Sequence, residues 1–219
     1  MPTRLHAALA WRTALLLLMV CTGVSSAADT RSAATVSLMR QGGHILVFRS
    51  TATEPDQADS DPLHPEHAKA QRPLSRQGRE QAAGVGKMLR ELRVPTGDTY
   101  TSKFKRAMDT AKLAGFGPIT PLDWLTEAGV LLSPAENEHR AEWFRHLLRE
   151  RPQRGANVVV VADRANIADA IGAELWGLEE GELVLVRPDM GTPLGFSVIG
   201  RLTLRELRAH WLEVRGSAK

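Results

Sequence analysis

The 219-residue sequence contains a single cysteine, Cys21, one tyrosine and only 5% aromatic residues. One cysteine cannot form a disulfide within the chain, so a small disulfide-stapled scaffold is excluded. The chain is 43% hydrophobic and 24% charged, with 18 glycines and 12 prolines, which excludes a disordered or collagen-like protein. These proportions are typical of a globular protein, and the longest apolar stretch lies close to the N-terminus.

Residues 1–27 have the three parts of a secretory signal peptide. Two arginines and no acid come first, an apolar run follows over about residues 13–24, and Ser25-Ser26-Ala27 supplies small residues for cleavage. The run of roughly 12 residues is shorter than the about 20 that a membrane-spanning helix needs. We therefore expect cleavage near Ala27 or Ala28, a mature domain at 28–219 in the periplasm, and no stable membrane anchor.

Cys21 leaves a lipoprotein as an alternative to the free exported form. In the order Leu18-Met19-Val20-Cys21, a lipid could be attached to the cysteine thiol. Val20 is bulkier than the small residue expected before a lipidated cysteine, so the sequence favours the free form.

Cleavage after residue 27 would also change the charge. It removes two of the 28 basic residues and none of the 25 acidic ones, so the formal charge falls from +3 to +1. A basic surface for nucleic acid is then no longer indicated, and we expect no nucleic-acid partner. The mature domain would contain no cysteine to serve as a nucleophile or metal ligand.

The remaining sequence alternates between helical and extended patterns. Residues 44–48 and 157–161 are uninterrupted apolar runs, which is typical of strands buried on both faces of a parallel sheet. The alternation predicts one α/β domain with three layers, α/β/α, around a mainly parallel sheet. We expect further strands at 98–101, 183–187 and 196–202, and helices at 33–40, 75–92, 103–113, 138–151, from about 166, and 204–214.

Residues 51–73 form a long polar stretch with four prolines, which we expect to be a functional or disordered loop. Residues 124–132 remain ambiguous. In the helix predicted at 138–151, Trp143, Leu147 and Leu148 are expected to share the buried face.

Several motifs, taken in order, resemble the histidine phosphatase superfamily, which has the phosphoglycerate-mutase-like fold. Any one of these motifs is a weak signal, but the ordered set is specific and spans roughly residues 36–202. The motifs are Gly42-Gly43, the strand ending in Arg49, Leu74 to Ala82, Ser102 with Arg106 to Ala111, Val158 to Val161 with Asn166-Ile167, and Gly181-Glu182 with Arg187-Pro188-Asp189.

The resemblance implies a phosphate pocket at the ends of two strands. In the family, a histidine attacks phosphorus, and two arginines and a second histidine surround the phosphate oxygens. Arg49 and Arg106 match the two arginines. Ser50 and Asp163 stand where the resemblance places the two histidines, so the resemblance implies that catalysis is impaired. No cofactor is implied.

Ser50 and Asp163 are poor substitutes for the expected histidines. A serine hydroxyl is a weak nucleophile near neutral pH, and its phosphoester resists hydrolysis far more than a phosphohistidine. Asp163 brings a negative charge, and we expect it to pair with Arg49 or Arg106 in place of a phosphate. Glu127 could correspond to the acid that some family members use to protonate the leaving group, or it could be a surface or capping acid.

The loop histidines His64 and His67 have the i, i+3 spacing of metal ligands. The sequence shows no third ligand beside them, so we predict no metal site. His139 and His146 lie two helical turns apart, which is too far for one shared metal ion.

The resemblance favours a degenerate phosphatase that binds a phosphorylated small molecule or another anion. One alternative is a phosphomonoesterase with a non-standard nucleophile, Ser50 or a loop histidine, acting on sugar phosphates of the cell envelope. A second alternative is a non-enzymatic interaction module with residues 51–73 as its contact surface. The sequence does not name a protein partner.

Overall fold

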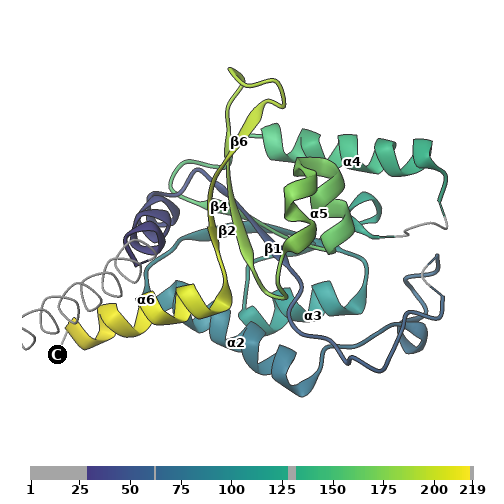
Figure 1. The fold of residues 1–219 in the computed structure, drawn as a ribbon, viewed down its shortest axis with the longest axis horizontal. Helices are drawn as coiled ribbons and strands as arrows, with labels where there is room; N and C mark the ends of the chain where they lie inside the picture. The colour runs from purple at the N-terminus through teal and green to yellow at the C-terminus, as the bar shows by residue number, and fades with distance from the viewer. Residues whose placement is uncertain (1–28, 62, 128–131, 218–219) are drawn as a thin grey trace, which may run out of the picture.

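The computed structural model describes residues 29–61, 63–127 and 132–217. In this part of the chain, six strands form one sheet in the order β3-β2-β4-β1-β5-β6 (Figure 1). Strands β1 to β4 run parallel, and β5 and β6 join antiparallel, which confirms the predicted mainly parallel sheet. The strands are β1 (Ile45–Arg49), β2 (Thr96–Ser102), β3 (Ile119–Leu122), β4 (Asn157–Ala162), β5 (Leu183–Pro188) and β6 (Phe196–Leu202).

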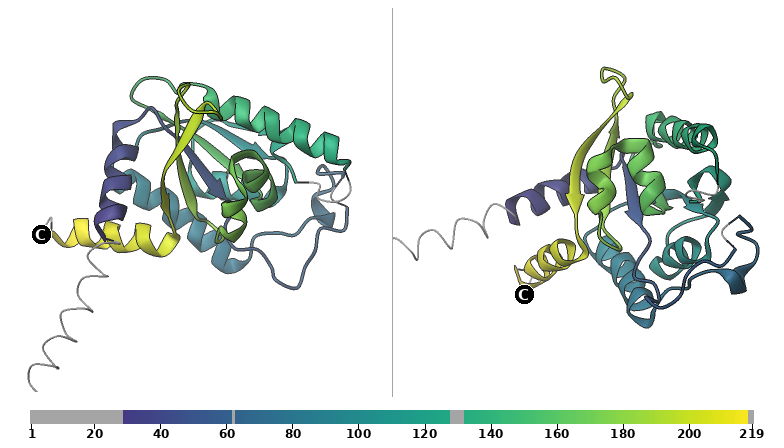
Figure 2. Two further views of the ribbon diagram at one scale, coloured as in Figure 1. Left: turned by 45° about the horizontal axis from the view of Figure 1, so that its top comes forward. Right: turned by 45° about the vertical axis from the view of Figure 1, so that its right-hand side comes forward.

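Helices cover both faces of the sheet, as the two views of Figure 2 show. Residues 29–41 are helical. The other helices are α2 (Arg76–Glu91), α3 (Lys105–Ala114), α4 (Pro134–Arg149), α5 (Arg164–Ile171) and α6 (Leu204–Ser217), with short 3-10 turns η1 (Ala68–Ala70), η2 (Asp123–Leu125) and η4 (Ala173–Gly177).

The side chains of β1 alternate between two hydrophobic cores. Leu46 and Phe48 pack with residues 29–41, α2, α3 and α6 on one face. Ile45 and Val47 pack with α4, α5 and η4 on the other face. Because both faces of the strand are covered, residues 45–48 are all apolar, as predicted. The predicted three-layer α/β/α architecture is therefore confirmed.

Each predicted helix and strand is present, with shifts of a few residues at the ends. One packing prediction is wrong, because Trp143 of α4 is 49% exposed. The buried face of α4 is instead centred on Phe144 and Leu148, which lie four residues apart. The helix also begins earlier than expected, because the Ser133 hydroxyl accepts a hydrogen bond from the Glu136 N–H and caps it at Pro134.

The predicted signal segment, residues 1–27, lies outside the described residues. Among residues 29–217 as described, no helix combines the length and apolar character needed to cross a membrane. The polar stretch 51–73 contains the turn η1 and runs along the same end of the molecule as the carboxyl end of β1 (Figure 1). This loop therefore passes close to the strand ends at which the site was predicted.

Candidate functional site

The parallel pairing of β1 with β4 brings the two predicted strand ends together. Arg49 is in register with Ala162, so Ser50 and Asp163 follow their strands at the same edge of the sheet. The Ser50 N–H donates to the Ala162 carbonyl at 3.3 Å, and both Ser50 and Asp163 are buried. The structure thus places these two residues side by side, as predicted.

Arg106 reaches the same edge from the first turn of α3. Its guanidinium lies 4.1 Å from the centre of the Phe104 ring, and its Nε donates to Asp163 Oδ1 at 2.8 Å. The Arg106 and Asp163 side chains are each only 3% exposed. The predicted pairing of Asp163 with an arginine therefore occurs, and its partner is Arg106.

A second carboxylate on Arg106 comes from the long loop. Arg106 Nη1 donates to both carboxylate oxygens of Asp59, at 3.1 and 2.8 Å. Burial acts to lower the pKa of Arg106, but the charges and hydrogen bonds of Asp163 and Asp59 outweigh burial and raise that pKa. Nothing in the sequence singles out Asp59, because the loop holds several acids and has no periodic pattern.

Arg49 makes its own contacts with other groups, although the charge of Asp163 also acts on it. Its Nη1 donates to the Leu178 carbonyl at 2.6 Å, and its Nη2 lies 3.6 Å from Glu180 Oε1. Burial is the main cause that lowers the pKa of Arg49. The charges of Arg164 and Arg72 lower it further, while Glu180 opposes them. Arg49 therefore lies among other arginines, and its guanidinium does not share a partner with that of Arg106.

Arg72 is a further cation that the sequence did not single out. Its backbone N–H donates to Asp59 Oδ1 at 2.8 Å, while its Nε is buried without a hydrogen-bond partner in the described structure. Its charge acts on both Arg49 and Glu127. A guanidinium nitrogen in this position has an unused capacity to donate to an anion.

The start of α2 fixes the chain that leaves Ser50. The Ser75 hydroxyl accepts from the Gly78 N–H at 3.0 Å and donates to the Ala52 carbonyl at 3.2 Å. A Cβ on Gly78 would lie 1.8 Å from the Ala52 oxygen, so only glycine permits this approach. The Leu-Ser-x-x-Gly motif therefore holds the segment after β1 against α2.

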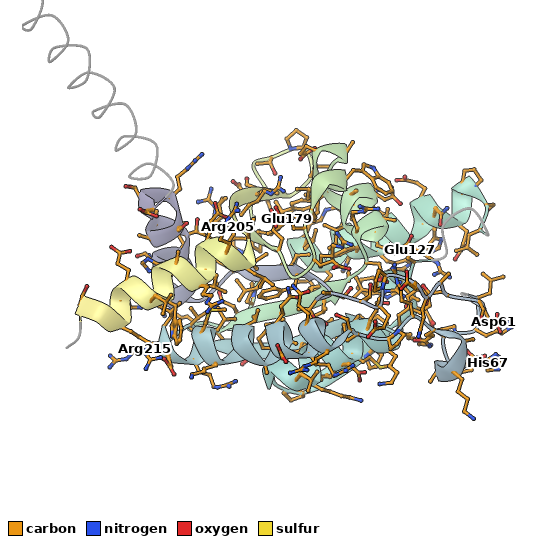
Figure 3. All side chains as sticks on the ribbon, turned by 60° about the horizontal axis from the view of Figure 1, so that its bottom comes forward. Asp61, His67, Glu127, Glu179, Arg205 and Arg215 are labelled. Carbon is orange, nitrogen blue, oxygen red and sulfur yellow. The ribbon has the colours of Figure 1, made fainter. Side chains whose placement is uncertain are left out.

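Glu127 lies beside the buried pair. Its backbone N–H lies 3.4 Å from Asp163 Oδ2, and burial, followed by the charge of Asp163, raises the pKa of its carboxyl. A cavity of about 640 Å³ continues from Glu127 along α4 and α5 to Trp176. Figure 3 shows Glu127 at the same end of the molecule as the loop carrying Asp61 and His67.

A family model of the histidine phosphatase superfamily (branch 1) matches residues 67–186, which is more than half of the chain. The chain belongs to this superfamily. The match contains Arg106, Glu127 and Asp163, and it begins after Arg49 and Ser50.

Solved structures of two phosphatases and of a third protein share the fold at low sequence identity. A phosphoserine phosphatase from Entamoeba histolytica in complex with 3-phosphoglyceric acid is 14% identical, with a TM-score of 0.54, and the alignment covers 75% of this chain and 98% of that one. The protein histidine phosphatase SixA complexed with tungstate is 17% identical, with a TM-score of 0.52 and coverage of 75% and 99%. YhfR from Bacillus stearothermophilus is 20% identical, with a TM-score of 0.52 and coverage of 74% and 98%. No curated protein matches this chain.

Within this histidine phosphatase superfamily domain, Ser50 differs from an activated nucleophile. In the described structure its hydroxyl makes no hydrogen bond, so no base contacts it, and the nearby acid Asp163 is bound to Arg106 instead. An activated serine needs a base within hydrogen-bond reach. Within the described residues, the arrangement therefore provides buried charges but no nucleophile–base pair at Ser50.

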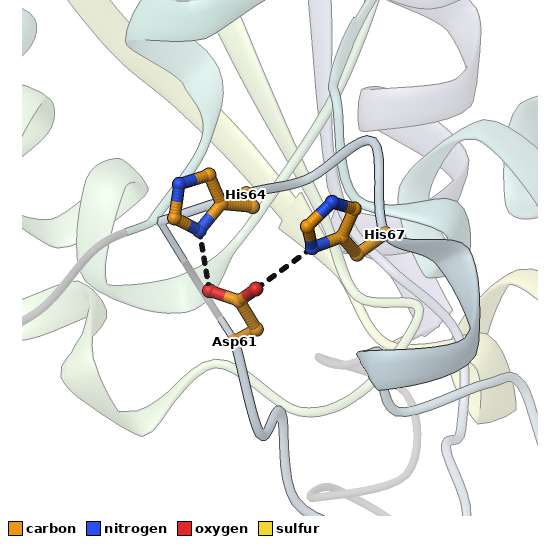
Figure 4. Close-up of side chains that lie close together, drawn as sticks. All are labelled: Asp61, His64 and His67. Carbon is orange, nitrogen blue, oxygen red and sulfur yellow. Dashed lines mark hydrogen bonds and ion pairs between the residues drawn. The ribbon is translucent and has the colours of Figure 1, made fainter.

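The expectation that His64 and His67 have no third ligand is wrong. Asp61 lies between them, with its two carboxylate oxygens 2.6 and 2.8 Å from the two Nδ1 atoms (Figure 4). Hydrogen bonds from both histidines lower the pKa of Asp61, and Asp61 raises the pKa of His64. The sequence carried the signal, because Asp61 precedes His64 by the same three-residue step that separates the histidines.

Proposed function

We propose that this protein is an exported, degenerate histidine phosphatase that binds a phosphorylated or other anionic ligand without turning it over. The observation that carries the proposal is the pairing of buried Arg106 with both Asp163 and Asp59. A phosphate-binding arginine is useful only while its donors are free for the substrate. Here three donor–acceptor contacts from Arg106 end on carboxylates of the same chain.

Ser50 and Asp163 stand in for the two histidines in this proposal. Without a base at its hydroxyl, Ser50 attacks phosphorus poorly near neutral pH. Asp163 presents an acceptor oxygen where a phosphate needs a donor, and its charge repels the phosphate. At an effective dielectric of 20, two unit charges about 5 Å apart repel by roughly 3 kcal/mol. A charged hydrogen bond contributes about 1.5–3 kcal/mol, so Asp163 offsets about one arginine.

The charges around Arg49 support binding of an anion. The positive charges of Arg164 and Arg72 act on Arg49, and the acids Glu180 and Asp163 oppose them. The buried Nε of Arg72 has no hydrogen-bond partner in the described structure. We assign the anion site to Arg49 and Arg72, because Arg106 is already neutralised.

Enzyme assays and ligand-dependent melting test the proposal together. Between about pH 5 and 8, p-nitrophenyl phosphate should be hydrolysed no faster with the wild type than in buffer without protein. This is about the pH range in which histidine ionises. Inorganic phosphate should raise the melting temperature of the wild type and of Arg76→Met, but not of Arg72→Met. Arg76 is an exposed arginine at the start of α2 and serves as the matched control.

A double variant, Ser50→His with Asp163→His, tests whether the scaffold can still support catalysis. Measurable hydrolysis by a folded double variant would support the assignment of these two positions. Hydrolysis by the wild type would contradict the degenerate reading. The absence of both hydrolysis and a phosphate-dependent shift in the wild type would contradict the ligand-binding proposal and favour an interaction module.

A phosphomonoesterase with Ser50 as nucleophile is the second candidate. The observation that favours it is the raised pKa of Glu127, because a buried carboxyl that keeps its proton can protonate a leaving group. In this case wild-type hydrolysis should be abolished by Ser50→Ala and reduced by Glu127→Gln. Loss of activity in only one of the two variants would contradict the combination of Ser50 as nucleophile and Glu127 as acid.

Export is part of the proposal and rests on the pattern of residues 1–27. N-terminal sequencing of protein from the periplasmic fraction should begin near Ala28 or Asp29. Recovery of the intact N-terminus only in the cytoplasmic fraction would contradict export.

A further inference from the structure

Asp61, His64 and His67 form a compact cluster on the long loop, here called the Asp61 cluster. One carboxylate oxygen lies 2.6 Å from His64 Nδ1, and the other lies 2.8 Å from His67 Nδ1. The imidazole rings stack with centroids 5.3 Å apart and planes inclined by 26°. One ligand atom from each residue lies within 4.8 Å of the other two. Figure 4 shows all three side chains pointing into the same space.

The backbone brings the three side chains to one side of the loop. The His64 N–H donates to the Asp61 carbonyl at 3.2 Å, and the His67 N–H donates to the His64 carbonyl at 2.9 Å. The two successive turns therefore repeat one three-residue step. The loop is also closed at its base, since the Ser60 N–H donates to the Ala70 carbonyl at 2.8 Å.

Gln71 anchors the loop that carries the Asp61 cluster. Its Nε2 donates to the Pro65 carbonyl, between the two histidines, and its Oε1 accepts from the Lys105 N–H at 2.5 Å. Gln71 is buried, and Lys105 is the first residue of α3. The three donors are thus attached to the folded domain, which reduces the conformational entropy lost when they bind a common ion.

The donor set is that of a divalent transition metal. Imidazole nitrogens and a carboxylate oxygen bind Zn²⁺ at about 2.0–2.2 Å, and three such protein ligands leave a coordination position for water. Ligand atoms around a tetrahedral ion lie about 3.3 Å apart, so the nitrogen–oxygen separations of 2.6 and 2.8 Å must increase by about 0.5–0.7 Å. The side chains are 34–58% exposed, so this adjustment disturbs no core packing.

We propose that the Asp61 cluster binds one divalent transition metal ion through His64 Nδ1, His67 Nδ1 and an Asp61 carboxylate oxygen. Each imidazole then coordinates through an unprotonated Nδ1, with its hydrogen carried on Nε2, and any further proton is released to solvent. Among first-row ions, imidazole-containing sites favour Cu²⁺, Zn²⁺ and Ni²⁺ over Mn²⁺. The site shares no residue with the proposed anion site, so each of the two proposals can fail without the other.

Calorimetric titration of the untagged full chain with Zn²⁺ tests the metal site. After treatment with a chelator, the protein should bind one ion per chain. His64→Ala and His67→Ala should each weaken binding by at least about tenfold, the lower end for the loss of even an outer-shell partner of a metal. Asp61→Asn should weaken binding by a similar factor.

Two controls separate this site from other zinc ligands. The double variant His139→Ala with His146→Ala removes exposed histidines of α4, and Cys21→Ser removes the only thiol of the sequence. Both controls should bind Zn²⁺ as the wild type does. Circular dichroism without metal should be the same for all variants. The proposal would be overturned if the wild type did not bind one Zn²⁺ ion per chain. It would also be overturned if His64→Ala and His67→Ala left Zn²⁺ binding unchanged.

Discussion

Arg106 Nε and Asp163 Oδ1 lie 2.8 Å apart, and each of these two side chains is only 3% exposed. The pair joins α3 to the end of β4 inside the domain. Such a pair adds little net stability over an apolar one, but removal of one partner leaves the other as an isolated buried charge. The free energy of unfolding and the availability of Arg106 to a ligand therefore both depend on the contact between Arg106 and Asp163.

Arg106→Met should lower the free energy of unfolding by about 3–5 kcal/mol, because it leaves Asp163 and Asp59 without their cation. Urea unfolding at neutral pH measures this loss. The control Arg76→Met, in an exposed pair with Glu80, should change stability by about 0–1 kcal/mol. A loss below about 1 kcal/mol for Arg106→Met would show that the ion pair is not structurally required.

Asp59→Asn should strengthen the binding of inorganic phosphate. It removes one of the two negative charges on Arg106 while keeping a similar shape, so a ligand oxygen can compete for the guanidinium. We expect about a tenfold gain in affinity, which corresponds to about 1.4 kcal/mol. Calorimetric titration with phosphate measures the change, and Asp56→Asn, an exposed acid of the same loop, should leave the affinity as it is.

Glu127 should give stability a specific dependence on pH. Because the folded-state pKa of Glu127 is raised above its ordinary value of 4.5, the folded protein holds this proton more tightly than the unfolded chain. The stabilisation is fully present below about pH 4.5 and is lost as pH rises through the folded-state pKa.

Glu127→Gln removes that dependence. Relative to this variant, the free energy of unfolding of the wild type, measured with urea, should decrease as pH increases from about 4 to about 8. A buried carboxyl with a raised pKa loses its proton within about this interval. Glu80→Gln, at an exposed acid of α2, is the control and should reproduce the wild-type pH profile. A constant difference between the wild type and Glu127→Gln over this range would contradict the raised pKa.

Gly78→Ala should destabilise the domain, because the new Cβ would lie 1.8 Å from the Ala52 oxygen. Overpacking against backbone costs about 1–3 kcal/mol in unfolding free energy. Gly84→Ala, in the same helix but with open space around its Cα, should instead stabilise by about 0.5–1 kcal/mol. Equal effects of the two substitutions would show that the approach of α2 to the chain after β1 is not tight.

The sequence was sufficient to predict the layers and the two strand ends. Apolar runs at β1 and β4 indicated buried parallel strands, and parallel neighbours end at one edge, so Ser50 and Asp163 had to lie close together. Arg106 was identified only through the resemblance of Ser102 and Arg106 to Ala111 to a motif of the superfamily. These predictions succeeded because regular strands and helices repeat their geometry along the chain.

The parts of the site that depend on the irregular loop could not be predicted. Asp59 reaches Arg106 across 47 residues of sequence, and no spacing rule distinguishes it from the other acids of the loop. The direction of the Arg49 guanidinium is set by the Leu178 carbonyl and Glu180, which follow η4 far along the chain. Such contacts depend on tertiary packing and have no local sequence signature.

The pairing of Arg106 with Asp163 would also make histidine chemistry at positions 50 and 163 hard to reach in single substitutions. Asp163→His alone would place a base, or a second cation, beside a buried guanidinium that has lost a partner, and so it would reduce stability before any activity appears. Ser50→His alone would add a nucleophile to a pocket whose arginine is still held by two carboxylates. One single variant would lose stability, and the other would gain no activity. The effects of the two substitutions therefore depend on each other, which favours retention of the present residues.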